Sequence, residues 1–275
     1  MVTARLKGGL GNQMFQIAAA YAYAKDYDDE FGIDLKITHH GGQGHPHLKY
    51  ENNLYKDIPR VSFKDKEFSM YNEPKFSYTK IEKQPTNVIL DGYFQTEKYF
   101  EKYKDEVQNL FTFPNDITEQ VNTKYNKIKE VFDVEKVVCV HVRRGEYLQI
   151  QNIHPAQTVA YYKTAMNKFK DDKVAFVVIS DDMAWCEQNL SGDNVSFFNT
   201  GYDYFTTPRT EELLELFDLY LATICDHNII PNSSFGWWGA FLNKNNNTVY
   251  APSTWFGPDG PQDYDDIYCE GWLTL

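Results

Sequence analysis

The sequence predicts an α/β protein whose sheets are mainly parallel. Three observations predict this class: strand-like and helix-like segments alternate, two dense β-branched runs occur at 137–142 and 174–180, and a glycine-rich turn joins the first strand to the first helix. Strands that are apolar throughout are typical of sheets covered on both faces, as parallel sheets are. Alternating strands and helices build such sheets through crossover connections.

The first half of the chain opens with a strand–turn–helix unit. Apolar and polar side chains alternate until the chain reaches Gly8, and helical spacing of apolar residues begins after Gly11. Between this unit and the next clear strand the chain is less periodic. The segments expected in this half are strands at 2–6 and 88–91 and helices at 12–27 and 97–110.

The second half is easier to interpret. Thr210 is an expected N-cap, because Glu211 and Glu212 follow it in the first helical turn, where the helix dipole favours acids. The expected helices are 119–132, 157–170, 183–190, 210–225 and 233–242, and the expected strands are 137–142, 174–180, 228–231 and 248–251.

Composition excludes several classes of protein. A net charge of −12 argues against a nucleic-acid or anionic-membrane partner. No stretch approaches the roughly 20 apolar residues of a membrane span, and the N-terminus has no signal-peptide pattern, so we expect a cytoplasmic protein. The four cysteines lack metal-site spacing and are expected to be reduced and partly buried: Cys139, Cys186, Cys225 and Cys269.

The glycine turn is the first candidate binding segment. Gly9 and Gly11 would let the backbone approach a phosphate or a sugar closely, and helix N–H groups would point at it from Asn12 and Gln13 onwards. Glycine-rich turns are also common without any binding role. The turn alone therefore leaves both interpretations open.

The second candidate is His141-Val-Arg-Arg-Gly-Glu-Tyr147, at the end of the most apolar strand. The chain has only five arginines, and two of them, Arg143 and Arg144, are adjacent here. Guanidinium groups match phosphate oxygens bidentately, so this pair predicts a diphosphate site. The alternative is a surface ion pair with Glu146.

Two further segments follow predicted strands, where open α/β sheets bind ligands. Asp181 and Asp182 could accept hydrogen bonds from a base or a ribose, or could simply cap the next helix. Ser233 and Ser234 begin a helix after Asn232, and could offer hydroxyl and N–H groups to phosphate or only cap that helix.

Metal binding has weaker support. Two D-x-D segments, 26–29 and 263–266, could hold Mn²⁺ or Mg²⁺, but one ends a helix and the other lies in the tail, so we interpret them as solvated acidic turns. The histidines of the 39–47 loop could suggest a zinc site, but no Cys or carboxylate ligands accompany them at zinc-site spacing. These histidines are His39, His40, His45 and His47. No metal is expected.

Taken in order, the segments resemble the α-1,2-fucosyltransferase family, glycosyltransferase family 11. The matching stretches are GGLGNQMFQ at 8–16, DGYFQTEKYF at 91–100, HVRRGEY at 141–147, SDDMAWC at 180–186, NSSFGWWGAFL at 232–242 and APSTWFGP at 251–258. The resemblance implies a GT-B-type architecture of two facing Rossmann-like domains, here 1–115 on the acceptor side and 135–275 on the donor side, joined by a helix at 116–134.

The resemblance also implies an inverting transfer of L-fucose from GDP-fucose, without a metal or a cofactor. The implied acceptor is a galactose-containing or similar oligosaccharide, and the expected acceptor atom is O2 of a terminal β-galactose. Another acceptor, another nucleotide sugar or a catalytically weak glycan-binding homologue are the alternatives. It implies that Arg143 and Arg144 bind the diphosphate, that His141 and an acid of 180–182 face guanine, and that Asn12 touches the sugar nucleotide. The family usually has Asp where this chain has Glu146, which is the first candidate for the general base, with His154 second.

Overall fold

The computed structural model describes residues 1–34, 47–170, 173–200, 213–245 and 248–275. The chain forms two compact units: unit 1 is Met1–Thr112 with Asp263–Cys269, and unit 2 is Phe113–Gln262 with Glu270–Leu275. The short segment Asp263–Cys269 thus packs in unit 1, although the sequence-based boundary places it in the C-terminal half. The helix expected to connect the halves belongs to unit 2.

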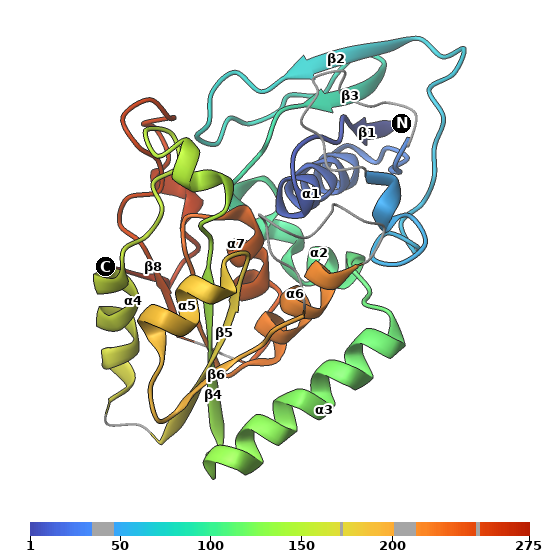
Figure 1. The fold of residues 1–275 in the computed structure, drawn as a ribbon. Helices are drawn as coiled ribbons and strands as arrows, with labels where there is room; N and C mark the ends of the chain where they lie inside the picture. The colour runs from blue at the N-terminus through green and yellow to red at the C-terminus, as the bar shows by residue number, and fades with distance from the viewer. Residues whose placement is uncertain (35–46, 171–172, 201–212, 246–247) are drawn as a thin grey trace. The chain divides into compact units, whose positions relative to one another are not determined.

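Unit 1 contains a three-stranded parallel sheet in the order β1-β3-β2. Its strands are β1 (Val2–Ala4), β2 (Phe68–Asn72) and β3 (Asn87–Asp91). Helix α1 (Leu10–Tyr27) follows β1 directly and packs beside the sheet (Figure 1). The predicted strand–turn–helix unit and the strand near 88–91 are confirmed, whereas β2 was not assigned from the sequence.

The continuous helix predicted at 97–110 is wrong. The chain instead makes two 3₁₀ turns, Glu97–Tyr99 and Glu101–Tyr103, before α2 (Lys104–Leu110). Phe100 separates the two turns at φ −140°, outside the helical region, and its side chain is 1% exposed. Burial of this ring therefore overrides the local helical preference.

Unit 2 contains a six-stranded parallel sheet in the order β6-β5-β4-β7-β8-β9. The strands are β4 (Lys136–Val142), β5 (Val174–Ser180), β6 (Val195–Phe197), β7 (His227–Ile229), β8 (Val249–Ala251) and β9 (Leu273–Thr274). The four strands predicted here are confirmed within three residues at each end. The short outer strands β6 and β9 were missed.

The helices of unit 2 are α3 (Asn115–Phe132), α4 (Val159–Met166), α5 (Met183–Leu190), α6 (Leu214–Ile224) and α7 (Ser234–Phe241). The long segment predicted at 157–170 divides into α4 and a 3₁₀ turn, Asn167–Phe169. The remaining 3₁₀ turns are Glu146–Gln149 in unit 2, and His47–Tyr50 and Asp265–Ile267 in unit 1. The predicted cap Thr210 lies outside the described residues, as do Glu211 and Glu212.

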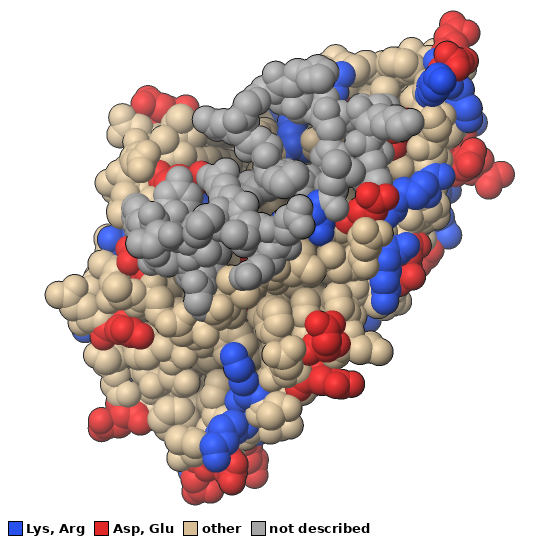
Figure 2. Space-filling model, turned by 45° about the vertical axis from the view of Figure 1, so that its right-hand side comes forward, with Lys and Arg blue, Asp and Glu red and all other residues tan. Residues whose placement is uncertain are grey.

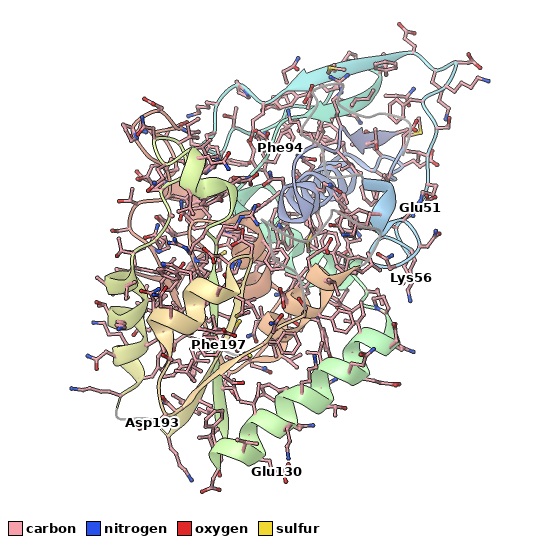
Figure 3. The ribbon with its side chains drawn as sticks, in the orientation of Figure 1. Glu51, Lys56, Phe94, Glu130, Asp193 and Phe197 are labelled. Atoms are coloured by element: carbon pink, nitrogen blue, oxygen red, sulfur yellow. The ribbon has the colours of Figure 1, made fainter. Side chains whose placement is uncertain are left out.

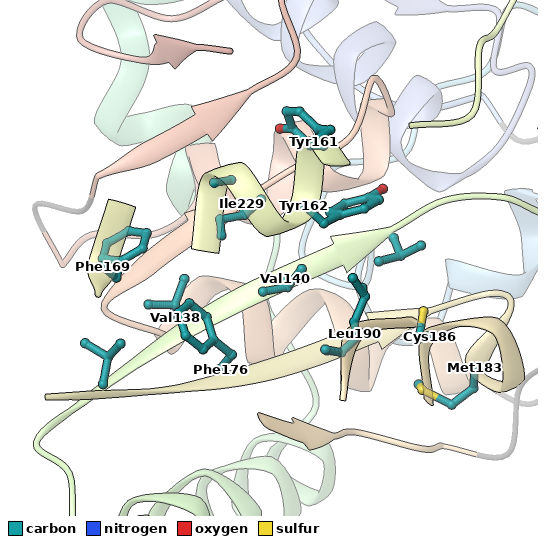
Figure 4. Packing of buried hydrophobic residues seen from close by; sticks show 14 residues of the cluster. Val138, Val140, Tyr161, Tyr162, Phe169, Phe176, Met183, Cys186, Leu190 and Ile229 are labelled. Atoms are coloured by element: carbon teal, nitrogen blue, oxygen red, sulfur yellow. The ribbon is translucent and has the colours of Figure 1, made fainter. Parts of the chain in front are cut away.

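The core of unit 2 explains why its strands are apolar throughout. Val138, Val140 and Val142 pack toward α4 and α5 in a cluster of buried side chains (Figure 4). The intervening side chains of β4 point to the opposite face, where α3 and α6 pack. Both faces of the central strands are covered, so polar side chains gather where the strands end.

Acidic and basic side chains are interspersed on the face drawn in Figure 2. All four cysteines are buried as free thiols. Within the described ranges, no helix has the length and apolar character needed to cross a membrane.

Candidate functional site

The adjacent carboxyl ends of β4 and β5 bring the two charged segments of unit 2 together. β4 pairs with β5 in parallel, with Val142 opposite Ser180. Arg143 and Arg144 therefore leave the sheet beside Asp181 and Asp182. This is the edge where open α/β sheets bind ligands.

Arg143 is held by two carboxylates. Its Nη2 donates to Glu146 Oε1 at 2.8 Å, and its Nη1 lies 2.9 Å from Asp181 Oδ2. The guanidinium carbon also lies 5.5 Å from the centre of the Tyr147 ring. Burial disfavours the charged form of Arg143, but the nearby carboxylates, Asp181 foremost, raise its pKa. Arg143 is thus a fixed cation. Its pairing with Glu146 was weighed from the sequence, but Asp181 as a second partner was not.

Arg144 is held along one edge only. Its Nε donates to Asp182 Oδ2 at 2.9 Å, and its guanidinium carbon lies 4.0 Å from the centre of the Trp185 ring. Its side chain is 16% exposed. Across the described ranges, neither terminal nitrogen of Arg144 has a hydrogen-bond partner. The outer edge of this guanidinium can therefore bind an anion bidentately.

Asp181 and Asp182 are already engaged by these arginines. Asp181 Oδ1 accepts from the backbone N–H of Arg144 at 2.9 Å, in addition to its ion pair with Arg143. Asp182 Oδ1 accepts from the backbone N–H of Trp185 at 3.2 Å and so caps α5. The capping alternative considered from the sequence holds for Asp182. Neither acid is left free to meet a base or a ribose without giving up a partner.

His141 is the penultimate residue of β4, and its ring lies 5.3 Å from that of Phe235 in the first turn of α7. It is 6% exposed, and its Nδ1 is buried without a hydrogen-bond partner. The α-carbon of Gly236 faces this atom, since a Cβ there would lie 2.5 Å from Nδ1. Burial, reinforced by Arg143, lowers the pKa of His141 to about 3, so the ring is neutral at physiological pH.

The start of α7 is tied to the arginine loop through Tyr147. The Tyr147 hydroxyl donates to the carbonyl of Asn232 at 3.0 Å. Asn232 is 1% exposed, donates to the carbonyl of Trp255 at 2.9 Å and accepts from Gln157 at 2.9 Å. Its amide is thus part of the scaffold, contrary to the predicted ligand contact.

The two serines differ in exposure. Ser233 is 5% exposed, and its side chain pairs with Tyr147. Ser234, the first residue of α7, is partly exposed, and its hydroxyl has no hydrogen-bond partner in the part of the chain that the structure describes. Ser234 and the N–H groups of the first helical turn are therefore the available donors at this helix.

The two candidate bases differ in environment. Glu146 is 39% exposed and paired with Arg143. His154 stacks on Tyr147 with ring centres 4.9 Å apart and lies against Phe256. Its Nδ1 is buried and unpartnered, and burial lowers its pKa below the ordinary value, so it is neutral at pH 7.

In unit 1 the glycine turn is held by buried amides. Gln13 is fully buried, donates to the carbonyl of Gly8 at 2.9 Å and accepts from the Tyr55 hydroxyl at 3.1 Å. The predicted contact of Gln13 with a ligand is therefore replaced by a structural role. Gly11 is buried in the first turn of α1, whereas Gly9 and Asn12 are partly exposed.

Asp218 is a candidate functional residue that was not predicted from the sequence. It lies in the middle of α6, 7% exposed, with Oδ1 buried and unpartnered. Burial raises its pKa well above the ordinary value, and neighbouring Glu215 acts in the same direction. An acid at a position where helical spacing expects an apolar residue was the available signal.

The acidic segments weighed for metal binding have other partners. Asp26 accepts from Lys102 at 2.7 Å and from Tyr103 at 2.8 Å. Asp263 and Asp266 accept from the backbone N–H groups of Ser77 and Tyr78, at 3.0 and 2.9 Å. In the described ranges no three His, Cys, Asp or Glu side chains cluster as a metal site. The histidines of the 39–47 loop lie outside the side chains that the structure describes.

Comparison with known proteins places this geometry in a family. The chain is 29% identical over 302 residues to an α-1,2-colitosyltransferase of Escherichia coli, covering 100% of this chain and 99% of that protein. It is 24% identical over 281 residues to galactoside α-(1,2)-fucosyltransferase 2 of Oryctolagus cuniculus, covering 95% and 72%.

Among solved structures, fucosyltransferase NodZ from Bradyrhizobium matches with a TM-score of 0.57 and 16% identity, covering 88% of this chain and 92% of that one. This likeness confirms the predicted α/β fold of GT-B type. The sequence model of Glycosyl transferase family 11 matches residues 1–275. The chain belongs to glycosyl transferase family 11.

Proposed function

We propose that this glycosyltransferase moves L-fucose from GDP-fucose to a glycan hydroxyl, O2 of a terminal β-galactose, with inversion and without a metal. The observation that carries the proposal is the open outer edge of Arg144, fixed by Asp182 and Trp185. A lectin would have no use for such an anion site. Relatives named for α-1,2 transfer of fucose or colitose support the linkage.

The diphosphate would lie between Arg144 and the start of α7. Tyr147 joins the arginine loop to α7, so the guanidinium edge, the Ser234 hydroxyl and the helix N–H groups belong to one rigid arrangement. Breaking the sugar–phosphate bond increases the negative charge on the leaving diphosphate. Donors fixed in advance stabilise that charge more in the transition state than in the ground state.

Guanine recognition falls to Asp218 in this proposal. Guanine presents two adjacent N–H donors on its Watson–Crick edge, and an Asp side chain that gives up its proton on binding is the complementary acceptor. Asp218 is buried and has no hydrogen-bond partner in the described chain, while Asp181 and Asp182 serve the arginines. A nucleotide that supplies two donors would satisfy a group that otherwise lies unpaired.

His154 is the better candidate for the base that deprotonates the acceptor. Glu146 already accepts a hydrogen bond from Arg143, so using it would break the arrangement that fixes this cation. His154 is neutral at pH 7, as a base must be, and its ring plane is set by Tyr147. This order reverses the one drawn from the sequence.

The test is mass-spectrometric detection of fucose transfer from GDP-fucose to lactose in EDTA, for wild type, Arg144→Ala and Arg60→Ala. Arg60 is an exposed arginine whose side chain donates to the carbonyls of Ile58 and Glu51, so it is a matched control. We expect loss of about 10²–10³ in rate for Arg144→Ala alone. Failure of the wild type to bind GDP in preference to UDP would refute the proposal.

A second donor has specific support. Because one relative is named a colitosyltransferase, GDP-colitose is the alternative sugar nucleotide. Offering GDP-fucose and GDP-colitose in the same assay gives the ratio of their kcat/KM values. A ratio strongly favouring colitose would retain the fold, the linkage and the diphosphate site, and would replace only the donor sugar.

A further inference from the structure

Tyr93 presents an exposed aromatic ring at the carboxyl end of the unit 1 sheet. It follows β3, which ends at Asp91, and it is 40% exposed. Ligands bind at this edge of parallel sheets. The Lys7 ammonium lies 5.0 Å from the centre of the ring and pairs with Asp91 Oδ1 at 2.8 Å. Lys7 therefore covers one face of the ring, and no ring in the described chain packs on the other face.

Lys7 is itself held in place. Its backbone N–H donates to Gln16 Oε1 at 2.9 Å, and its carbonyl accepts from Gln16 Nε2 at 3.1 Å. Gln16 is fully buried in α1. The Lys7 ammonium shares Asp91 with Arg5, whose Nη1 lies 2.9 Å from Asp91 Oδ2. A fixed cation thus sets the orientation of the Tyr93 ring.

The turn that carries Tyr93 is costly to build. Phe94, labelled in Figure 3, is fully buried at φ +53°, a left-handed conformation that residues other than glycine seldom adopt. The Glu73 carboxylate accepts from the backbone N–H groups of Tyr93 at 2.6 Å and Phe94 at 3.0 Å, and burial raises its pKa. Gly92 admits Glu73, since a Cβ there would lie 2.4 Å from the Cβ of Glu73. Backbone strain of this kind is concentrated at ligand sites, and among residues 92–96 only Tyr93 is exposed.

We propose that Tyr93 is an acceptor-binding residue whose open face stacks on the apolar face of a galactose ring of the acceptor glycan. This inference rests on the proposed function. The 4-hydroxyl of galactose is axial, so the hydrogens on C3, C4 and C5 lie together on one face of the sugar. That face is apolar and can pack on an aromatic ring. In glucose the hydrogen on C4 points to the opposite face, so the corresponding apolar surface is smaller.

The test compares the kinetics of fucose transfer to lactose for wild type, Tyr93→Ala, Tyr93→Phe and Tyr93→Trp. Loss of the ring should raise the KM for lactose about 3- to 10-fold, with kcat and GDP affinity unchanged. The Phe and Trp variants keep an aromatic face and should stay within about twofold of wild type. Phe68→Ala is the matched control, because it removes an exposed ring where β2 begins, at the opposite end of the sheet, and it should leave these constants unchanged.

A measurement of sugar selectivity separates stacking from a purely structural role. In wild type, methyl β-galactoside should compete with lactose more strongly than methyl β-glucoside does. The ratio of the two inhibition constants should fall in Tyr93→Ala and be retained in Tyr93→Phe. A merely structural role would instead lower Tm and weaken the binding of both sugars and of GDP.

Three results would overturn the inference: wild-type KM for lactose in Tyr93→Ala, equal losses in Tyr93→Ala and Tyr93→Phe, or a loss of GDP affinity in place of lactose affinity. Lactose binding is also measured directly by saturation-transfer NMR in the presence of GDP, and its absence in the wild type would overturn the inference as well. A wild type that does not bind GDP in preference to UDP would refute the proposed function itself, so the two failures are distinguishable.

Discussion

Asp182 has two functions that one pair of substitutions can separate. Its Oδ1 caps α5 through the backbone N–H of Trp185, and its Oδ2 accepts from Nε of Arg144. Asn is as good an N-cap as Asp, but it has only one oxygen. Asp182→Asn keeps the cap and turns an NH₂ group toward the Nε–H of Arg144, whereas Asp182→Ala loses both contacts.

The expected magnitudes follow from these contacts. Both charged side chains are largely buried, at 16% and 14% exposed. A hydrogen bond to a charged group contributes about 1.5–3 kcal/mol, and each 1.36 kcal/mol is tenfold in rate. If the orientation of Arg144 depends on this bond, Asp182→Asn should lower kcat/KM by about 10- to 100-fold. The lost cap in Asp182→Ala should cost about 1 kcal/mol more in stability.

The assays are GDP-fucose transfer kinetics, GDP binding by calorimetry and thermal unfolding. Asp182→Asn should lose activity and lower Tm through the broken ion pair, and Asp182→Ala should lose the same activity and about 2–4 °C more. Thr158→Ala is the matched control, because Thr158 caps α4 through the N–H of Tyr161 and contacts neither arginine. Wild-type kcat/KM and GDP affinity in Asp182→Asn would refute the role of Asp182 in orienting Arg144.

Three further predictions concern groups with altered pKa values and the question of a metal. Burial raises the pKa of Asp218, so the folded state keeps a proton that the unfolded state loses above about pH 3.8. Asp218→Asn should therefore raise the free energy of unfolding at pH 7, and this gain should vanish in acid. The same substitution should weaken GDP binding, because Asp218 is the proposed guanine contact. Burial lowers the pKa of His154, so the acid limb of the kcat/KM profile should lie below pH 6.5, and His154→Gln should remove that limb and cost about 10²–10⁴ in rate; an unchanged profile would exclude His154 as the base. Transfer in EDTA should equal transfer in added Mg²⁺ or Mn²⁺, measured by initial rates.

The sequence pattern was sufficient to predict those elements in which burial and secondary-structure propensity favour the same conformation. β5 and α5 have the predicted bounds, Val174–Ser180 and Met183–Leu190, because a β-branched run ends at an acid that caps the next helix. Around Phe100 the two disagree, and burial of the ring prevails. Short outer strands such as β9 carry little pattern of their own, since pairing with a neighbour defines them.

The site was predictable in its residue types but less so in its contacts. Adjacent arginines after a buried strand predicted an anion site, and the structure places these arginines beside the two acids. Sequence order could not tell which polar side chains turn inward, so Gln13 and Asn232 were assigned to the ligand although both are buried in the scaffold. Asp218 was overlooked because an isolated acid in an amphipathic helix ordinarily faces water.

The acids beside the arginines change what diphosphate binding requires. Three carboxylates, those of Glu146, Asp181 and Asp182, contact two guanidinium groups. The arginine pair is therefore neutralised before any anion arrives, and an incoming diphosphate meets acids as well as cations. Metal-independent binding then depends, beside the open edge of Arg144, on donors without a formal charge, the Ser234 hydroxyl and the N–H groups at the start of α7.

The alternative is that a divalent cation supplies the missing charge. The two cases differ in what EDTA and substitution at the helix do. If α7 provides the donors, Ser234→Ala weakens GDP binding equally with and without Mg²⁺, and EDTA has no effect. If a cation neutralises the diphosphate, EDTA lowers GDP affinity in the wild type, and the effect of Ser234→Ala becomes small. Calorimetry of GDP binding to the wild type and to Ser234→Ala, each in EDTA and in Mg²⁺, therefore decides whether the helix donors or a cation offset the negative charge of the three carboxylates.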